Sequence, residues 1–370
     1  MNIKLAYKKK IDFQQLILNG TIFLLGLNYL IYCFFSDDQY KNALRIFLIP
    51  ILAVAIFYRR KFSRTHLIIL AASLYALAIN GDMALNIAFI LIISVISITL
   101  CGLEKEFVRI LNRTQILLSI IVLIALLLGI VTPKSMTVGG RIRNDLGFMN
   151  INSAAVFFSS TILLYCMCTE KMVWHKAIFV LLLSVFLWRL TDSRTSFLGI
   201  LLFFITLFIL YLLRKKKKIQ RWYLTISAVV LLCSPLLWQS GVLNNFLFNQ
   251  LLSLRPRLFS KYCQDSSIIN LFIGGSKAGE IDNAWLMLLY NIGLPLYIAF
   301  GALTLRALRR LVDVGNCRSA SFLIMMLAVG MMETLPLRCE ILTAILFWYI
   351  VIKYGTFRKS NPILLKEDKR

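Results

Sequence analysis

The chain has 370 residues, of which 59% are apolar and only 16% charged, and its mean hydropathy is +0.78. A water-soluble domain of this length needs a larger polar fraction to cover its surface, so the composition predicts that lipid is the main solvent. The net charge of +24 would indicate nucleic acid in a soluble protein. Here the cations form short clusters between apolar runs, without interleaved aromatic side chains, and this pattern excludes a nucleic-acid-binding protein.

Apolar segments long enough to cross a bilayer as helices recur along the whole chain. Irregular backbone cannot face lipid, so the fold class is predicted to be all-α, a polytopic membrane protein with about twelve transmembrane helices. A basic start leads directly into the first segment without a small-residue cleavage site, which predicts an uncleaved first helix. The segments lie at 15–35, 43–58, 66–80, 83–101, 115–132, 151–168, 176–190, 196–213, 222–239, 284–304, 319–335 and 341–355.

Lysine and arginine alternate from one side of the predicted membrane to the other. Under the positive-inside rule, their distribution places both termini in the cytoplasm and makes residues 1–370 a single integral membrane domain. The long loop at 240–283, between the ninth and tenth helices, then lies on the outer side. Its part 242–262 mixes apolar and polar residues, as an amphipathic helix on a membrane surface does. The cytoplasmic clusters lie at 4–10, 59–64, 105–113, 171–176, 214–221, 306–318 and 353–370.

Cysteine and histidine give no pattern of a metal centre. The eight cysteines fall mainly inside apolar runs, where they are interpreted as small buried side chains. His66 and His175 are far apart in the sequence, and no CxxC motif is present. The sequence therefore predicts neither a metal nor a cofactor.

Several arginines lie in the predicted outer loops, where the positive-inside rule expects few cations. A guanidinium group matches phosphate oxygens with two parallel donors, so several converging at an outer helix mouth would suit a diphosphate on a lipid carrier. A single outer arginine is more often solvated or bound to a lipid headgroup, and Asp192 offers Arg194 a simple ion pair. The arginines are Arg141 and Arg143 in GGRIRNDLGFMNINSAA, Arg194 in LTDSRTSFLG, and Arg255 and Arg257 in LSLRPRLFSKY.

Asparagines and acidic residues stand at the same predicted helix mouths. Asn150 and Asn152 open the sixth helix, where they would either cap backbone N–H groups or bind sugar hydroxyls. Glu280, Asp282 and Asn283 precede the tenth helix, where a carboxylate would either cap the helix or act as a base on a sugar hydroxyl.

The last predicted outer turn carries three more charges. Glu333 and Glu340 bracket this turn, with Arg338 between them. Carboxylates in membrane segments are costly and therefore point to function, although Arg338 could neutralise one of them for structural reasons.

Three stretches of the chain, spanning about 141–300, resemble the O-antigen and capsular polysaccharide polymerases (Wzy-type), a family related to the O-antigen ligases. They are GRIRNDLGFMNINSAA, TDSRTSFLGILL, and LSLRPRLF followed by GGSKAGEIDNAWLMLLYNIGLPL. The resemblance implies a glycosyltransferase C-like fold in the bacterial cytoplasmic membrane and a metal-independent reaction. A growing glycan on undecaprenyl diphosphate would be transferred to another lipid-linked repeat unit, releasing undecaprenyl diphosphate. The implied partners are the lipid-linked oligosaccharide, membrane lipid, a flippase and a chain-length regulator.

The resemblance also implies roles for the residues at these motifs. Arg143, Arg194 and either Arg255 or Arg257 would hold the diphosphate and stabilise charge on the leaving group. The base stays open between three carboxylates, because the functional histidine that some ligases carry in the large outer loop is missing here, which also disfavours the ligase reading. The catalytic candidates are Arg194, Asp282 and Glu333, and the substrate-binding candidates are Arg141, Arg143, Asn150, Asn152, Arg255, Arg257, Glu280 and Asn283.

A twelve-helix transporter or flippase would explain the number of helices equally well. Transporters commonly have related halves and a polar site near the middle of the membrane. In this sequence the halves are not visibly repeated, and the notable charges stand at outer helix mouths. A purely structural membrane protein would leave the outer arginines unexplained, so polymerisation is the leading hypothesis.

Overall fold

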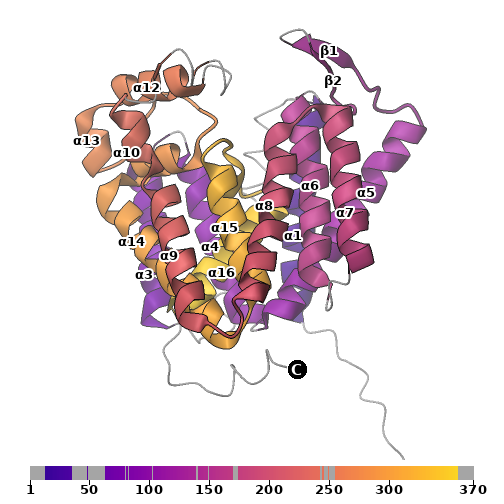
Figure 1. Cartoon of the computed structure of the whole chain (residues 1–370). Coiled ribbons are helices and arrows are strands. Elements are labelled where there is room, and N and C mark those ends of the chain that lie inside the picture. Colours follow the sequence, from indigo (N-terminus) through magenta and orange to yellow (C-terminus); the bar gives the residue numbers. More distant parts are fainter. Residues whose placement is uncertain are drawn as a thin grey trace, which may run out of the picture.

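The computed structural model describes residues 13–35, 48, 63–79, 81, 83–101, 103–138, 141–148, 150–169, 174–241, 244–245, 249 and 255–356. Within these residues the chain is a bundle of α-helices with one two-stranded sheet (Figure 1). The predicted helix at 43–58 lies outside the described residues except for Leu48.

Each of the other predicted segments coincides with a helix, and the all-α prediction is confirmed for the described residues apart from the small sheet. The helices are α1 (Phe13–Phe35), α3 (Arg64–Ile79), α4 (Ala84–Cys101), α5 (Glu104–Leu127), α6 (Ile151–Cys168), α7 (Trp174–Thr191), α8 (Arg194–Leu212), α9 (Lys217–Leu232), α10 (Ser234–Gln239), α12 (Arg255–Asp265), α13 (Ile268–Phe272), α14 (Ala284–Val314), α15 (Cys317–Gly330) and α16 (Leu342–Thr356).

Helix α16 forms the centre of the bundle. It is apolar on every face, and residues 342–355 are all buried, as expected for a helix surrounded by others. Helices α4, α5, α6, α14 and α15 pack around it. The buried core of the molecule is therefore arranged around α16, the last helix that the structure describes.

The outer helices bury one face and expose apolar side chains on the other. In α5 the buried positions recur every three or four residues, while Leu117, Ile120 and Leu127 stand exposed. An exposed apolar surface of this extent indicates contact with lipid. In the part of the chain that the structure describes, six helices are long and apolar enough to cross a membrane, with spans at Gln15–Phe34, Ala84–Cys101, Glu104–Leu127, Arg194–Leu212, Lys217–Gln239 and Ala284–Val314.

Several predicted boundaries differ in the structure, and the segment predicted at 115–132 is the helix Glu104–Leu127. The segment 222–239 is broken at Cys233 into α9 and α10, because Pro235 lacks an N–H donor and its ring obstructs the preceding turn. The segment 319–335 ends as a helix at Gly330 and continues as an irregular turn with one short 3₁₀ helix, η1 (Leu335–Leu337). Helix α14 runs beyond 304 to Val314.

Helix α14 is also interrupted, at Gly293. This glycine has φ 78° and ψ 161°, a conformation that only glycine adopts readily. The N–H groups of Gly275 and Ser276 donate to the carbonyl oxygens of Asn291 and Tyr290, at 3.1 Å each. The loop before α14 therefore satisfies carbonyl groups that the interruption leaves without helical partners.

The non-helical parts gather at one end of the bundle, which we call the α12 end. The strands β1 (Ser135–Val138) and β2 (Arg141–Asn144) pair antiparallel there, with Met136 opposite Arg143. Figure 1 shows this hairpin and α12 at the top. The hairpin was not predicted from the sequence. Within the predicted long loop at 240–283, the structure contains the helices α12 and α13.

Candidate functional site

The irregular turn between α15 and α16, residues 331–341, organises the charged groups at the α12 end. Leu335, Leu337 and Cys339 on this turn are buried, so the backbone is anchored in the core. The polar residues between them are thereby held at fixed positions. They include Glu333, which is buried, and Arg338, which is partly exposed.

Arg255, the first residue of α12, connects this turn to the loop before α14. Its Nη2 atom lies 3.2 Å from Glu333 Oε1 and 3.4 Å from Asp282 Oδ2. The Glu333 side chain is only 12% exposed and that of Asp282 is 52% exposed. One arginine is therefore shared between a buried and an exposed carboxylate.

The surroundings of Glu333 change its acidity. Burial, and after it the neighbouring Asp282 carboxylate, raises the pKa of Glu333 to about 7. The Arg255 guanidinium and a hydrogen bond from the Thr195 side chain act in the opposite direction. A carboxyl group with a pKa near 7 exchanges protons readily at neutral pH, which is the property of a general base or acid.

Two further carboxylates of this end surround Arg338. The Arg338 Nη2 atom lies 3.0 Å from Glu280 Oε2, and its Nε donates to Thr334 Oγ1 at 3.1 Å. Burial alone would lower the pKa of Arg338, but Glu280 and Glu340 hold it above its ordinary value. Arg338 is therefore firmly charged and ties the loop before α14 to the α15–α16 turn.

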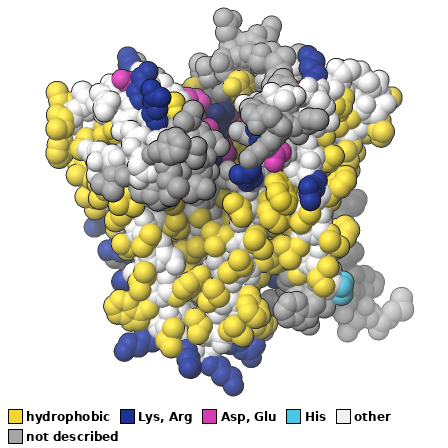
Figure 2. All heavy atoms as spheres, turned by 45° about the horizontal axis from the view of Figure 1, so that its top comes forward, with side chains coloured by type: hydrophobic (Ala, Val, Ile, Leu, Met, Phe, Trp, Pro, Cys, Tyr) yellow, Lys and Arg dark blue, Asp and Glu magenta, His cyan; other side chains and the backbone are white. Residues whose placement is uncertain are grey.

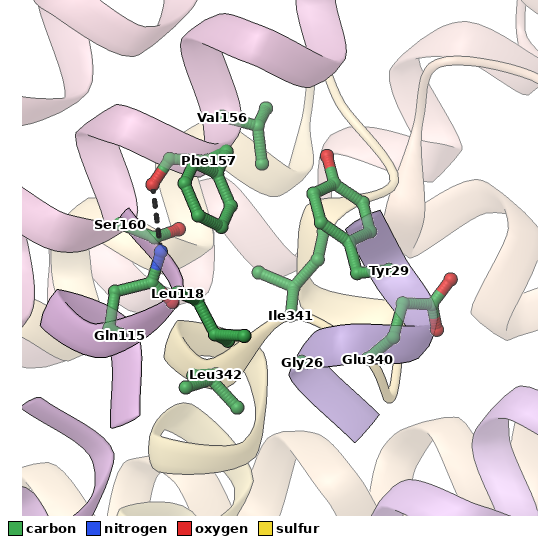
Figure 3. Close-up of a pocket in the computed structure, with 10 residues that line it drawn as sticks. All are labelled: Gly26, Tyr29, Gln115, Leu118, Val156, Phe157, Ser160, Glu340, Ile341 and Leu342. Atoms are coloured by element: carbon green, nitrogen blue, oxygen red, sulfur yellow. Dashed lines mark hydrogen bonds between the residues drawn. The ribbon is translucent and has the colours of Figure 1, made fainter. Parts of the chain in front are cut away.

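Glu340 is the most deeply buried of these acids, with 1% of its surface exposed. It lines a pocket between α1, α5, α6 and the α15–α16 turn, together with Tyr29 and Gln115 (Figure 3). In this pocket Gln115 donates to the Phe157 carbonyl at 3.2 Å, and the Glu340 carboxylate points away from Gln115. The pocket therefore separates two polar groups rather than bringing them together.

A second cluster forms around Arg143 on strand β2. Its Nη2 donates to the Asp192 carbonyl at 3.2 Å and to Asn152 Oδ1 at 3.4 Å, and its Nε lies 3.9 Å from Asp192 Oδ2. Asp192 has φ 49°, a left-handed conformation that aspartate tolerates better than most residues. Arg143 thus stabilises the turn between α7 and α8. Asp192, which was predicted to pair with Arg194, lies beside Arg143.

The first turn of α8 joins the two clusters. Thr195 hydrogen-bonds to Glu333, and Asp192, three residues earlier, contacts Arg143. Arg194 lies between them in the chain and its side chain is exposed. The Arg143 cluster and the Arg255 cluster are therefore neighbours at the same helix mouth.

A small, mostly apolar pocket lies beside Glu333 between α6, α8 and α15. Its walls combine apolar side chains with the hydroxyl groups of Ser159, Thr195 and Ser196. Gly199 of α8 keeps the helices close, because a Cβ there would stand 2.8 Å from Val329 of α15. The apolar lining consists of Val156, Leu163, Gly199, Met325, Met326, Val329 and Leu335.

Several predicted site residues have structural roles. Asn150 caps α6 by accepting from the Asn152 N–H at 2.9 Å, and Asn283 caps α14 by accepting from the Leu286 N–H at 2.9 Å. The capping interpretation is thus confirmed for Asn150, and at α14 the cap is Asn283 rather than Asp282. Asn283 is fully buried.

The other two predicted arginines are Arg257 and Arg141. Arg257 is exposed on α12, two residues beyond Arg255. Arg141 belongs to strand β2, opposite Val138, and its side chain lies outside the described residues. Of the predicted arginines, the structure therefore brings Arg143 and Arg255 to acidic partners at the helix mouth.

Sequence reasoning missed Thr195 as a part of the site. Its position directly after Arg194 gave no signal, because a threonine in the first turn of a helix is common. It also considered Arg338 as a partner of Glu333 or Glu340, whereas the structure pairs Glu333 with Arg255 and places Arg338 between Glu280 and Glu340.

The arrangement supports acid–base chemistry at an anion-binding helix mouth. It offers a buried carboxylate that titrates near neutrality, an exposed carboxylate beside it, and arginines that can exchange partners. Among the described residues, no group of three or more His, Cys, Asp or Glu side chains is arranged to hold a metal ion. No family model, curated protein or solved structure matches this chain.

Proposed function

We propose that this protein polymerises undecaprenyl-diphosphate-linked oligosaccharide units into a surface polysaccharide on the outer face of the bacterial cytoplasmic membrane. In this proposal about twelve helices cross the membrane, both termini are cytoplasmic, and the bundle is glycosyltransferase C-like. The α12 end faces outward.

The observation that carries the proposal is the pair of carboxylates on one arginine at the α12 end. Transfer of a glycan from a lipid diphosphate needs a base for the acceptor hydroxyl and a cation for the leaving diphosphate. Glu333, with its pKa raised to about 7, supplies the base, and Arg255 within 3.2 Å supplies the cation. Arg194 at the start of α8 and Arg143 on strand β2 add positive charge nearby.

The apolar surroundings of Glu333 support a lipid-linked substrate. The pocket beside it is lined mostly by aliphatic side chains and two methionines, whose flexible side chains adapt to irregular neighbours. In this proposal the prenyl chain lies in the bilayer against these helices, with its diphosphate at the mouth beside Arg255. This position of the charges, at helix ends rather than midway along the helices, favours surface chemistry over transport through the bundle.

The distribution of cations supports the proposed orientation. Figure 2 shows acidic and basic side chains together at the α12 end, a broad belt of hydrophobic side chains beyond it, and further Lys and Arg along the opposite end. The loop between α8 and α9 contributes Arg214 and 215–218 to this opposite end. Basic loops on one side are typical of a cytoplasmic face.

The test is reconstitution of the purified protein in lipid nanodiscs with an undecaprenyl-diphosphate-linked repeat unit. We expect a ladder of glycans extended by whole repeat units, and we expect Glu333→Gln to abolish the ladder because the amide cannot accept a proton. Glu106→Gln, which removes an exposed carboxylate of α5, should retain it. A Glu333→Gln protein that extends chains at the normal rate would remove Glu333 as the base.

Cells that lack the protein distinguish polymerisation from transport. A polymerase defect leaves single lipid-linked units on the outer leaflet, exported but not extended. Accumulation of these units only on the cytoplasmic leaflet would instead identify a flippase.

A further inference from the structure

Arg255 is held by two partners, each of which binds it weakly. Asp282 is 52% exposed, and an exposed ion pair contributes at most about 1 kcal/mol because water screens it. Glu333 is buried, but with a pKa of about 7 it carries its full negative charge only part of the time at neutral pH. Both contacts are made by the same Nη2 atom, at 3.4 and 3.2 Å.

A diphosphate would compete strongly for this guanidinium. It carries more negative charge than either carboxylate and offers pairs of oxygens that match the donor geometry of arginine. Arg255 is the first residue of α12, and its side chain is 21% exposed, so an anion arriving at the helix mouth can reach it.

We propose that Arg255 is a counter-ion switch: a bound diphosphate draws its guanidinium away from Asp282 and Glu333, and Glu333 then accepts the proton of the acceptor hydroxyl. When the diphosphate leaves, Arg255 returns to the two carboxylates and favours release of that proton. The inference rests on the proposed function in taking the diphosphate to be that of the glycan donor.

The transfer step balances in atoms and charge. The acceptor hydroxyl oxygen forms a bond to the anomeric carbon while the bond from that carbon to the diphosphate oxygen breaks. The bonding electron pair leaves with the diphosphate, which Arg255 holds, and the hydroxyl proton moves to a Glu333 oxygen. After release of the lipid diphosphate, the proton passes to solvent and the site is restored.

The charged groups that face Glu333 determine how it responds. Among the described residues they are Asp282 from the loop before α14 and Arg255 from α12, and the polar Thr195 side chain approaches from α8. Of these three groups, only Arg255 is a cation. Its movement to a diphosphate therefore removes positive charge from Glu333 and brings negative charge near it, and both effects raise the affinity of Glu333 for a proton.

The experiment measures protonation of Glu333 directly and needs no turnover. The protein in nanodiscs is treated with dicyclohexylcarbodiimide, which modifies protonated carboxyl groups in apolar surroundings, across a series of pH values. The modification of Glu333 is quantified by peptide mass spectrometry. We expect inorganic diphosphate, at constant ionic strength, to move the labelling midpoint upward by at least about one pH unit.

Two variants assign this response to Arg255. In Arg255→Gln the midpoint should already lie about one pH unit or more above that of the unmodified protein, and diphosphate should move it little. Lys261→Gln removes an equal charge from an exposed position on the same helix and should retain the full response. A midpoint in the unmodified protein that diphosphate does not move, whether inorganic or lipid-linked, overturns the inference even if a variant fails to fold.

A second ligand separates the sources of the anion. A response to undecaprenyl diphosphate in the nanodisc but not to the inorganic ion means that the switch requires a lipid-borne group, and a response to both means that the diphosphate alone suffices. The polymerisation assay is independent of this measurement. A protein that shows the shift but extends no glycan would therefore retain the switch and lose the proposed function.

Discussion

The surroundings of Glu333 explain why a carboxylate persists at a site with so little water. Its neighbours are a second carboxylate, an arginine and a hydroxyl-bearing side chain, each from a different part of the chain. The sequence identified Glu333 and Asp282 as candidates because acids are rare next to membrane segments. It did not show that Arg255 joins them, because Arg255 and Glu333 are 78 positions apart in the sequence and no local pattern fixes that pairing.

The same surroundings predict how glycan extension depends on pH. In the protein without bound donor, Glu333 is mostly protonated below a pH of about 7 and cannot accept the hydroxyl proton, so the rate at low donor concentration should fall there. Asp282→Asn removes a negative charge that raises the pKa of Glu333. The fall in rate on the acidic side of the pH profile, its acid limb, should therefore move to lower pH. The measurement is the rate of ladder formation across a pH series.

A matched variant controls for a general loss of negative charge. Asp265→Asn changes an exposed carboxylate at the end of α12 and should leave the acid limb unchanged. If Asp282→Asn leaves the limb in place as well, Asp282 does not act on the titrating group.

At the scale of single elements, the interruption of α14 is a feature that the hydropathy of the sequence does not predict. The run AWLMLLYNIGLPL is apolar apart from Asn291, so it predicted a continuous helix across Gly293. Two features interrupt the helix. Pro295 has no N–H to donate to the Asn291 carbonyl, and the segment 272–273 approaches so closely that a Cβ on Gly293 would stand 2.4 Å from the Phe272 carbonyl oxygen. Contacts of this kind depend on the tertiary arrangement and leave little trace in composition.

This interruption gives a prediction on stability. Gly293→Ala should lower stability by about 1–3 kcal/mol from backbone strain alone, and the contact with the Phe272 carbonyl adds to that. Gly301→Ala, in the regular part of the same helix, meets only Leu232 at 3.7 Å and should be close to neutral. The measurement is the midpoint of thermal unfolding in detergent, and equal midpoints for the two variants would contradict the strained geometry.

The β1–β2 hairpin shows a second limit of sequence reasoning at this scale. Each strand has four residues, too few for an alternating pattern to stand out. The positive charge of Arg143 predicts that it binds an anion. The structure adds that a strand positions its side chain beside the α7–α8 turn.

At the scale of the whole molecule, the apolar periodicity of the sequence was enough to predict the helices, because lipid permits no other regular structure in a single chain of this kind. It was also enough to place the candidate acids and arginines at helix ends. It could not predict that α16 is the central helix, since α4, α8 and α14 are similarly apolar and only packing distinguishes them.

The orientation in the membrane yields a prediction at the same scale. With exposed Cys233 replaced by serine, a cysteine introduced as Arg257→Cys should react with an impermeant thiol reagent added to intact cells. A cysteine introduced as Lys216→Cys, in the α8–α9 loop, should react only after the membrane is permeabilised. The reverse pattern would place the Arg255 cluster in the cytoplasm and exclude the proposed chemistry there.

The short acidic loop that carries Glu280 and Asp282 is hydrogen-bonded to α14 at both of its ends. At one end, the N–H groups of residues 275 and 276 donate to carbonyl groups within α14. At the other end, the buried Asn283 side chain caps the first turn of the same helix. Both ends of the loop are thus attached to α14, so the residues between them can move only a short distance. The spacing between this loop and the turn bearing Glu333 is consequently set when the protein folds, and in the proposed reaction the Arg255 side chain is the part of the site that moves.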